Sequence, residues 1–202
     1  MTLREKRKTL IVCLTGMPGA GKSTVASALK EKGFAVVTMG DAVRQEAKRQ
    51  NLDPTDGNLG KLMLKLRQDL GQGAVAHLVL KEIQERNLNE KNIVVDGIRS
   101  LPEVEVLKTV GHVRLLAIHA LPMVRFKHLK DRGRSDAPAS PTAFEERDKR
   151  ELSVGVSESI ALADEVISNN NITIEELKER ALAVVQSWLD EIKLQNQKRD
   201  TG

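Results

Sequence analysis

Residues 16–24 combine glycines, a lysine and hydroxyl side chains at spacings that suit phosphate binding. They read Gly-Met-Pro-Gly-Ala-Gly-Lys-Ser-Thr. The glycines let successive backbone N–H groups turn toward one anion without a Cβ in the way. At these spacings the lysine is expected to reach the β- and γ-phosphates of a nucleoside triphosphate, and the serine hydroxyl to ligate Mg²⁺. We therefore predict a loop that binds ATP and Mg²⁺, a P-loop, comprising Gly16, Met17, Pro18, Gly19, Ala20, Gly21, Lys22, Ser23 and Thr24.

A carboxylate at the end of a later apolar run is a second candidate for the metal site. The run at 93–95 leads directly into Asp96 and Gly97. The carboxyl ends of neighbouring parallel strands lie at one edge of a sheet, so Asp96 is expected beside the Mg²⁺, in contact directly or through water. The alternative is a strand-terminal aspartate that only begins a turn.

Charged residues after two apolar runs indicate a second substrate at the same edge. Asp41 and Arg44 follow one run, and Arg99 follows another. Ligands of open α/β sheets gather at the carboxyl ends of the strands, and a guanidinium group matches phosphate bidentately. We assign Asp41, Arg44, Arg67 and Arg99 to an anionic acceptor, with ordinary surface charges as the alternative. Asp41 could act as a general base for a hydroxyl acceptor or only cap the following helix.

Arginines gather around a proline-containing loop late in the chain, at 132–142. The group comprises Arg125, Arg132, Arg134, Arg147 and Arg150. Phosphoryl transfer needs positive charge on the transferring group, and a closing lid can bring it. We therefore predict catalytic roles for Lys22, Arg132, Arg134, Arg147 and Arg150. Because acidic residues interleave with Arg147 and Arg150, a solvated helix of ion pairs is the alternative for these two.

Apolar runs separated by amphipathic stretches must position these side chains. Strands are expected at 10–15, 34–39, 93–95, 113–119 and about 166–167, and helices at 22–32, 41–50, 58–86 with a break at 71–73, 102–109, 122–131, 142–162 and 174–194. Near-continuous apolar strands that alternate with helices indicate a parallel sheet covered on both faces. The predicted fold class is α/β: a three-layer P-loop NTPase sandwich around a five-stranded parallel sheet.

Length and composition limit the classes of protein to which this chain could belong. A chain of 202 residues suits one domain, and we treat 1–202 as one, with a disordered tail at about 196–202. Aromatic residues make up only 2%, which argues against a base-stacking surface for nucleic acid. The single cysteine, Cys13, has no intrachain partner, and no apolar stretch approaches the roughly 18 residues of a membrane span. We expect a cytoplasmic protein with a small-molecule phosphate acceptor. The oligomeric state stays open.

Six segments together resemble the adenylate-kinase-like group of nucleoside monophosphate kinases. More closely, they resemble an archaeal family of P-loop nucleotide kinases related to adenylate kinase and dephospho-coenzyme A kinase. The resemblance covers 10 to about 185. Its segments are GMPGAGKST at 16–24, MGDAVR at 39–44, VVDGIRS at 94–100, RGRSD at 132–136, FEERDKREL at 144–152 and ADEVISN at 163–169.

The resemblance implies an acceptor-binding insertion at about 41–76 and a short lid at about 132–147. Arg44 would bind the monophosphate as the arginine of a GD-x-x-R element, and Arg132, Arg134 and Arg147 would be the lid arginines. Asn169 and the residues up to 171 would flank the nucleotide base.

Two positions depart from the adenylate kinase pattern. Met39 stands where a threonine is usual, and Asp96-Gly97-Ile98-Arg99 stands where Asp-Gly-Phe/Tyr-Pro-Arg is usual. The acceptor therefore need not be AMP.

The leading interpretation is an enzyme that transfers the γ-phosphoryl group of ATP to a nucleoside monophosphate. One alternative is phosphorylation of a hydroxyl group, as in dephospho-coenzyme A kinase. Another is a nucleotide-dependent switch or ATPase with a macromolecular partner. Arginines supplied within the chain argue against a switch, because switches often receive that charge from a partner.

Overall fold

The computed structural model describes residues 9–88, 91–133 and 137–200. Its sheet has five strands, β1 (Leu10–Thr15), β2 (Ala35–Thr38), β3 (Ile93–Ile98), β4 (His112–His119) and β5 (Glu165–Ser168). Their order is β2-β3-β1-β4-β5, and every pairing is parallel. Parallel neighbours require crossover connections, which the intervening helices supply. The predicted α/β class and five-stranded parallel sheet are confirmed.

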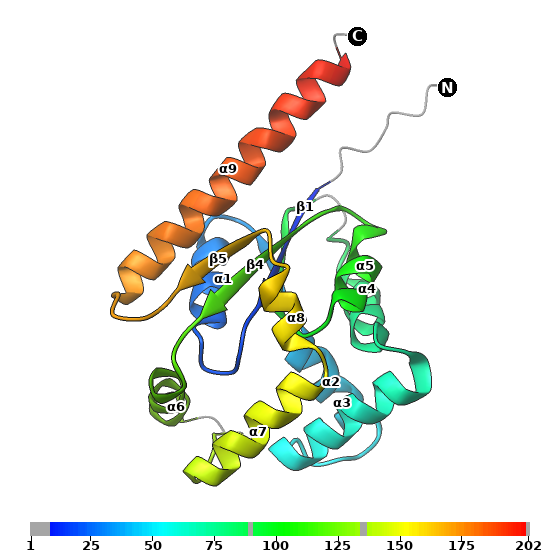
Figure 1. Ribbon diagram of the computed structural model, residues 1–202. Helices are drawn as coiled ribbons and strands as arrows, with labels where there is room; N and C mark the ends of the chain where they lie inside the picture. Colours follow the sequence, from blue (N-terminus) through cyan, green and yellow to red (C-terminus); the bar gives the residue numbers. More distant parts are fainter. Residues whose placement is uncertain (1–8, 89–90, 134–136, 201–202) are drawn as a thin grey trace.

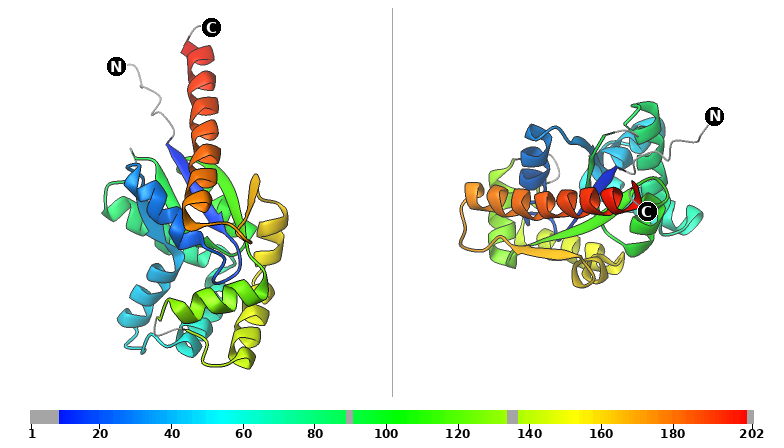
Figure 2. Two further views of the ribbon diagram at one scale, coloured as in Figure 1. Left: turned by 90° about the vertical axis from the view of Figure 1, so that its left-hand side faces the viewer. Right: turned by 90° about the horizontal axis from the view of Figure 1, so that it is seen from above.

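Helices cover both faces of the sheet (Figure 1). They are α1 (Lys22–Glu31), α2 (Met39–Arg49), α3 (Asp56–Leu70), α4 (Ala74–Glu85), α5 (Leu101–Lys108), α6 (Pro122–Asp131), α7 (Pro141–Ser153), α8 (Val156–Ala161) and α9 (Ile174–Asp200). Helices α1 and α9 pack on one face, and α4 and α5 pack on the other. Figure 2 shows that the distal part of α9 extends beyond the sheet. None of the helices in these ranges combines the length and apolarity that a membrane crossing requires.

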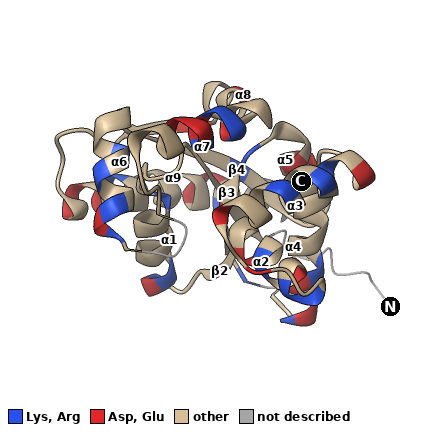
Figure 3. Cartoon of the chain, turned by 90° about the horizontal axis from the view of Figure 1, so that it is seen from below, with Lys and Arg blue, Asp and Glu red and all other residues tan. Residues whose placement is uncertain are grey.

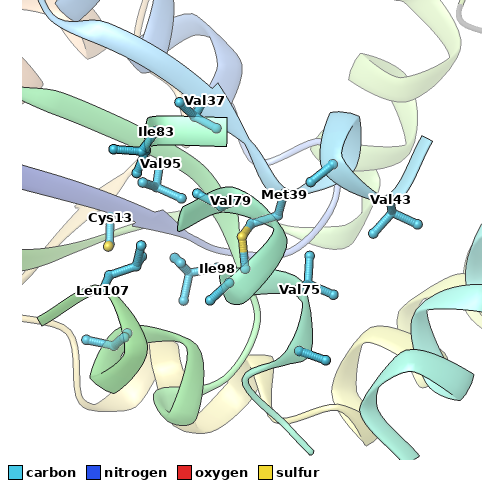
Figure 4. Close-up of a cluster of buried hydrophobic side chains, with 14 of the residues drawn as sticks. Cys13, Val37, Met39, Val43, Val75, Val79, Ile83, Val95, Ile98 and Leu107 are labelled. Carbon is cyan, nitrogen blue, oxygen red and sulfur yellow. The ribbon is translucent and has the colours of Figure 1, made fainter. Parts of the chain in front are cut away.

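The central strand β1 contributes to two cores because its side chains alternate between the faces of the sheet. Ile11 and Cys13 face the α4 and α5 side, whereas Leu10, Val12 and Leu14 face α1 and α9. All five are at most 1% exposed. Figure 4 shows the first of these cores, where side chains of β1, β2 and β3 meet those of α4 and α5. A strand buried on both faces reads as an unbroken apolar run, which is why β1 was predictable at its observed bounds.

The carboxyl ends of the strands define the functional edge. Figure 3 views the molecule from this edge, with α1 and α6 on one side of the strand ends and α2 and α3 on the other. Strand β3 runs further than predicted, to Ile98, and Gly97, at φ +98°, lies where its register shifts against β1. The pairing places Asp96 opposite Leu14 of β1 and Thr38 of β2. Asp96 therefore lies at the strand ends, as expected.

Helix α2 begins two residues earlier than predicted. Its N-cap is Thr38, whose Oγ1 accepts a hydrogen bond from the Asp41 N–H at 2.9 Å. The prediction that Asp41 caps this helix is therefore wrong. Asp41 lies in the first turn instead, where a carboxylate is favourable beside the positive end of the helix dipole.

Two further helix predictions need correction. The single helix predicted over 142–162 is two helices, α7 and α8. The helix is interrupted at Gly155, which has φ +100° and is the N-cap of α8. The C-terminal helix continues to Asp200, through most of the segment predicted to be disordered. No glycine or proline occurs between Ile174 and Asp200 to stop it, and the polar residues there include good helix formers.

Candidate active site

A cavity of about 990 Å³ opens at the carboxyl ends of the strands. This volume is at the upper end of the range for small-molecule sites. The cavity brings together most of the residues that the sequence singled out: Gly16, Pro18, Gly19, Gly21, Lys22, Ser23, Thr24, Asp41, Arg44, Asp96, Arg99, Arg132, Arg147 and Asn169. Arg134 lies outside the described residues. Met17, Ala20, Arg67 and Arg150 are not part of the lining.

The P-loop joins the end of β1 to the start of α1. Gly16 has φ +136°, and a Cβ on it would lie 2.2 Å from the Ile118 carbonyl oxygen of β4. Gly21, at φ +110°, is the N-cap of α1. The loop thus crosses the sheet edge closely and delivers the chain to a helix N-terminus, a favourable place for anionic phosphates. Met17 and Ala20 close the loop internally through an Ala20 N–H to Met17 carbonyl hydrogen bond of 3.1 Å.

Lys22 bends back over the P-loop. Its Nζ donates to the Gly16 carbonyl at 2.7 Å and to the Met17 carbonyl at 3.2 Å. Burial lowers the pKa of Lys22 to about 8, and the nearby Asp96 carboxylate only partly opposes this. A bound triphosphate would return negative charge to the ammonium group and favour its protonated form. Lys22 is therefore held beside the position that phosphates would take.

Ser23 and Asp96 both line the cavity and offer the oxygen ligands that Mg²⁺ prefers. Within the described ranges, no three His, Cys, Asp or Glu side chains gather as a metal-binding group. Mg²⁺ in phosphotransferases is usually held by one or two protein oxygens together with substrate phosphates and water. The two residues thus fit a metal that arrives with the nucleotide.

Arg44 and Asp41 lie on the cavity wall opposite the P-loop, on the first turns of α2. The Arg44 Nη1 donates to the Asp41 carboxylate at 2.6 Å. The side chains are 35% and 57% exposed, so both can reach a bound ligand. Thr38 also lines this wall. Met39, which departs from the adenylate kinase pattern, is fully buried in the core instead (Figure 4).

Arg99 is held inside the cavity by Glu151 of α7. The Arg99 Nε donates to the Glu151 carboxylate at 2.5 Å, and its Nη1 donates to the Gly97 carbonyl at 3.0 Å. Burial would lower the pKa of Arg99, but the carboxylate outweighs it and keeps that pKa above its ordinary value. Burial would likewise raise the pKa of Glu151, but the arginine outweighs it and keeps that pKa low. Both groups stay ionised at neutral pH.

Glu151 was not among the predicted site residues. On the sequence it is one of several acidic residues of a charged helix, and nothing local separates it from Glu145 or Glu146, which are exposed. Only the fold shows that Glu151 lines the cavity and contacts the guanidinium of Arg99.

Arg67 lies away from the cavity, in contrast to its predicted acceptor-binding role. Its Nη2 donates to the Glu103 carboxylate of α5 at 2.5 Å, and the two side chains are 3% and 0% exposed. The other Glu103 oxygen accepts hydrogen bonds from the backbone N–H groups of Arg99 and Ser100, at 2.8 and 3.3 Å. Arg67 therefore supports the turn that carries Arg99 and does not itself reach the cavity.

The late arginines divide between the cavity and a helix contact. Arg132, at the C-cap of α6, and Arg147 of α7 line the cavity. Arg150 instead donates through Nη2 to both carboxylate oxygens of Asp56, at 2.9 and 2.7 Å. A Cβ on Gly60 of α3 would lie 2.9 Å from the Arg150 Nε. Arg150 thus joins α7 to α3 through an ion pair between helices, which differs from the predicted solvated helix whose arginines pair with its own acidic residues.

Three residues outside the P-loop contact its backbone. Asn169, expected to flank the base, donates through Nδ2 to the Ala20 carbonyl at 2.9 Å. Arg125 and His128 of α6 contact the carbonyl oxygens of Pro18 and Gly19. The arginine cluster drew attention to Arg125, but nothing in the sequence assigned it a contact. No pattern in the sequence pointed to His128.

Comparison with known proteins extends this description. A family model described as an AAA domain matches residues 15–145. A UPF0200 protein of Methanocaldococcus jannaschii is 46% identical over 161 residues, which are 79% of this chain and 81% of that protein. A UPF0200 protein of Thermococcus onnurineus is 40% identical over 185 residues, 90% of this chain and 100% of that protein.

Solved structures support the same fold at lower identity. The protein TT1252 of Thermus thermophilus has a TM-score of 0.63 and 22% identity, covering 90% of this chain and 98% of that one. A shikimate kinase of Acinetobacter baumannii has a TM-score of 0.57 and 18% identity, covering 90% and 95%. A gluconokinase of Sinorhizobium meliloti has a TM-score of 0.53 and 15% identity, covering 95% and 99%. The chain is a member of the UPF0200 family of archaeal proteins and has a P-loop kinase-like fold.

Proposed function

We propose that the protein transfers the γ-phosphoryl group of ATP to a small phosphate-bearing acceptor, with a nucleoside monophosphate as the leading candidate. One observation carries the proposal. A single cavity is lined by a P-loop and also by Arg44, Arg99 and Arg147, which come from α2, the end of β3 and α7. In this proposal a donor site and a cationic acceptor site share one space, as direct transfer between two anionic substrates requires.

The donor half binds and orients ATP in this proposal. The P-loop N–H groups, the N-terminus of α1 and Lys22 hold the phosphates. Ser23 and Asp96 would hold Mg²⁺ against the phosphate oxygens. When bound, the metal would neutralise charge that develops on the transferring group.

The acceptor half binds a second phosphate through arginines. Arg44 is exposed enough to exchange its contact with Asp41 for a bidentate contact with a phosphate. Arg99 stays ionised beside Glu151 and keeps a fixed direction. A phosphate acceptor is already an anionic nucleophile, so this transfer needs no general base.

The catalytic arginines would stabilise the transferring group between the two halves. Arg147 and Arg132 line the cavity from α7 and the end of α6, and Arg134, outside the described residues, stays a predicted member of this group. Positive charge placed around the equatorial oxygens contributes most of the catalysis in this class of reaction.

A hydroxyl acceptor is the second candidate, and Asp41 is the observation that favours it. Its carboxylate lines the cavity and is 57% exposed, so it could take a proton from a hydroxyl nucleophile. The dephospho-coenzyme A kinase type of reaction belongs to this class.

An acceptor screen tests the proposal. The full chain is mixed with ATP and Mg²⁺, and ADP release is measured with each nucleoside monophosphate, with dephospho-coenzyme A and with no acceptor. The Lys22→Met variant measures contaminating activity. We expect one acceptor class to raise ADP release well above the acceptor-free rate. Hydrolysis that no acceptor stimulates would contradict phosphotransfer and favour a nucleotide-dependent switch or ATPase.

A further inference from the structure

Three consecutive carbonyl oxygens of the P-loop accept hydrogen bonds from side chains outside it. The Pro18 oxygen accepts from Arg125 Nη1 at 3.2 Å, the Gly19 oxygen from His128 Nδ1 at 2.9 Å, and the Ala20 oxygen from Asn169 Nδ2 at 2.9 Å. A carbonyl oxygen only accepts, so the His128 Nδ1 carries the proton in this contact.

These contacts constrain the direction of the N–H groups that a phosphate needs. The peptide unit is planar and trans, so its N–H points opposite to its C=O. With the carbonyls of residues 18–20 turned toward the three side chains, the N–H groups of Gly19, Ala20 and Gly21 point away from them. Ala20 uses its N–H within the loop, on Met17. Those of Gly19 and Gly21 point away from the three side chains, the direction that a phosphate bound on the other side of the loop would need.

Arg125 is the most heavily bonded of the three residues. It is 4% exposed, and its Nε also donates to the Ala120 carbonyl at 3.1 Å. Its Nη1 and Nη2 bind both carboxylate oxygens of Asp148, at 2.9 and 2.6 Å. The guanidinium also lies 4.9 Å from the ring centroid of Phe144. A planar fork with this many fixed contacts has one orientation, which a lysine could not reproduce.

The partner of Arg125 connects the P-loop to α7. Asp148 follows Arg147, which lines the cavity. Helix α6 also packs closely under the loop, because a Cβ on Gly19 would lie 2.5 Å from the Arg125 carbonyl oxygen. One guanidinium therefore contacts both the loop that holds the donor and the helix that carries a proposed catalytic arginine.

We infer that Arg125, His128 and Asn169 are positioning residues that form a carbonyl collar around the P-loop. The collar orients the phosphate-binding N–H groups before the nucleotide arrives, and Arg125 additionally sets α7 through Asp148. The inference rests on the proposed function only in that the P-loop binds a triphosphate. It needs no particular acceptor.

Binding of inorganic tripolyphosphate tests the collar, since this probe has no base or ribose. Its dissociation constant with Mg²⁺ is measured by calorimetry on the full chain. Replacing His128 by leucine removes the donor, whereas His128→Asn keeps a donor at an equivalent position. We expect His128→Leu to weaken binding roughly tenfold and His128→Asn to stay within about threefold of the native protein. Equal affinities for both variants would overturn the inference.

Hydrogen exchange distinguishes the effects of the two contacts of Arg125, one with the P-loop and one with Asp148 of α7. In Arg125→Lys we expect faster exchange in both 16–21 and α7, together with a roughly 10- to 100-fold weaker tripolyphosphate complex. In Asp148→Asn we expect faster exchange in α7 and an affinity for tripolyphosphate within about twofold of that of the native protein. Arg114→Lys is the control, because Arg114 pairs with Asp164 and Glu191 away from the cavity.

The outcomes distinguish the collar from the proposed function. A native protein that binds no tripolyphosphate would overturn both. A native protein that binds it, with Arg125→Lys binding equally well, would overturn the collar alone. If Arg125→Lys does not fold, the two His128 variants still decide.

Discussion

The Glu151 carboxylate of α7 accepts a hydrogen bond from the Arg99 Nε at the end of β3, 2.5 Å away, inside the cavity. The contact joins segments 52 residues apart in the sequence. It fixes the direction of a cation that the proposed acceptor would meet, and it brings α7 to the sheet edge. Breaking it should therefore change both acceptor binding and stability.

Glu151→Gln should weaken acceptor binding by releasing Arg99. We expect the acceptor KM to rise roughly tenfold and the free energy of unfolding to fall by about 2 kcal/mol, less than for a fully buried pair because the Arg99 side chain is 21% exposed. Steady-state kinetics and urea unfolding measure the two effects. Glu145→Gln on the exposed face of the same helix is the matched control. An unchanged KM would show that Arg99 does not bind the acceptor.

The same pair predicts a dependence of stability on acidic pH. Arg99 lowers the folded-state pKa of Glu151 below its ordinary value. The stabilisation is therefore present above the unfolded-state pKa and is lost as pH falls through the folded-state pKa. Urea unfolding between neutral and acidic pH should show a smaller loss of stability in Glu151→Gln than in the native protein. Parallel curves would mean that Glu151 contributes nothing to the acid transition.

Because of Lys22, the affinity for nucleotide should depend on pH in the alkaline range. Its pKa is lowered to about 8 in the free protein, and bound phosphates favour the charged form. Above that pH, binding should take up a proton, and affinity should fall as pH rises. Calorimetry at pH about 9 in buffers of different ionisation enthalpy measures the uptake. Lys22→Met should bind weakly with no uptake, and proton uptake retained in this variant would assign the effect to another group.

Arg67→Met should destabilise the protein because it leaves the buried Glu103 carboxylate without its arginine partner. Removing one partner of a buried ion pair typically costs about 3–5 kcal/mol, because the other charge stays unpaired. Two backbone N–H groups still reach Glu103, so we expect the lower end, about 3 kcal/mol, in urea unfolding. The exposed Lys65→Met on the same helix is the control. A large rise in acceptor KM with unchanged stability would restore the direct acceptor-binding role predicted from the sequence.

Asp41→Asn separates the two acceptor classes. If the acceptor is a phosphate, the substitution removes only a partner of Arg44, and kcat should stay within about threefold. If the acceptor is a hydroxyl, loss of the general base should lower kcat by roughly 10²- to 10⁴-fold. The measurement uses the acceptor found in the screen. A small loss with a hydroxyl acceptor would exclude Asp41 as the base.

Local sequence patterns predicted the sheet and the P-loop well. The inner strands β1, β3 and β4 were found because a strand buried on both faces is an apolar run, and the P-loop because its chemistry depends on residues that are adjacent in the chain. The N-cap of α2 was missed because Thr38 and Asp41 are both good capping residues, and only the backbone geometry decides between them.

Contacts between distant segments could not be predicted in this way. Arg125, His128 and Asn169 lie 107, 109 and 149 residues from the P-loop carbonyls that they contact. Arg67 was assigned to the acceptor because an arginine in that region suits an anion, yet Glu103, 36 residues away, takes that charge inside the core. Which carboxylate meets which arginine depends on the packing of helices, and one sequence does not contain that pairing explicitly.

The central place of β1 in the sheet has a consequence for biosynthesis. This strand is synthesised before both of its neighbours, β3 and β4, which come from residues 93–119. The last side chain against the P-loop backbone, Asn169, emerges later still. The nascent chain therefore carries its phosphate-binding residues for a time without the strands that hold them. Competence to bind ATP should appear only after Asn169 has left the ribosome.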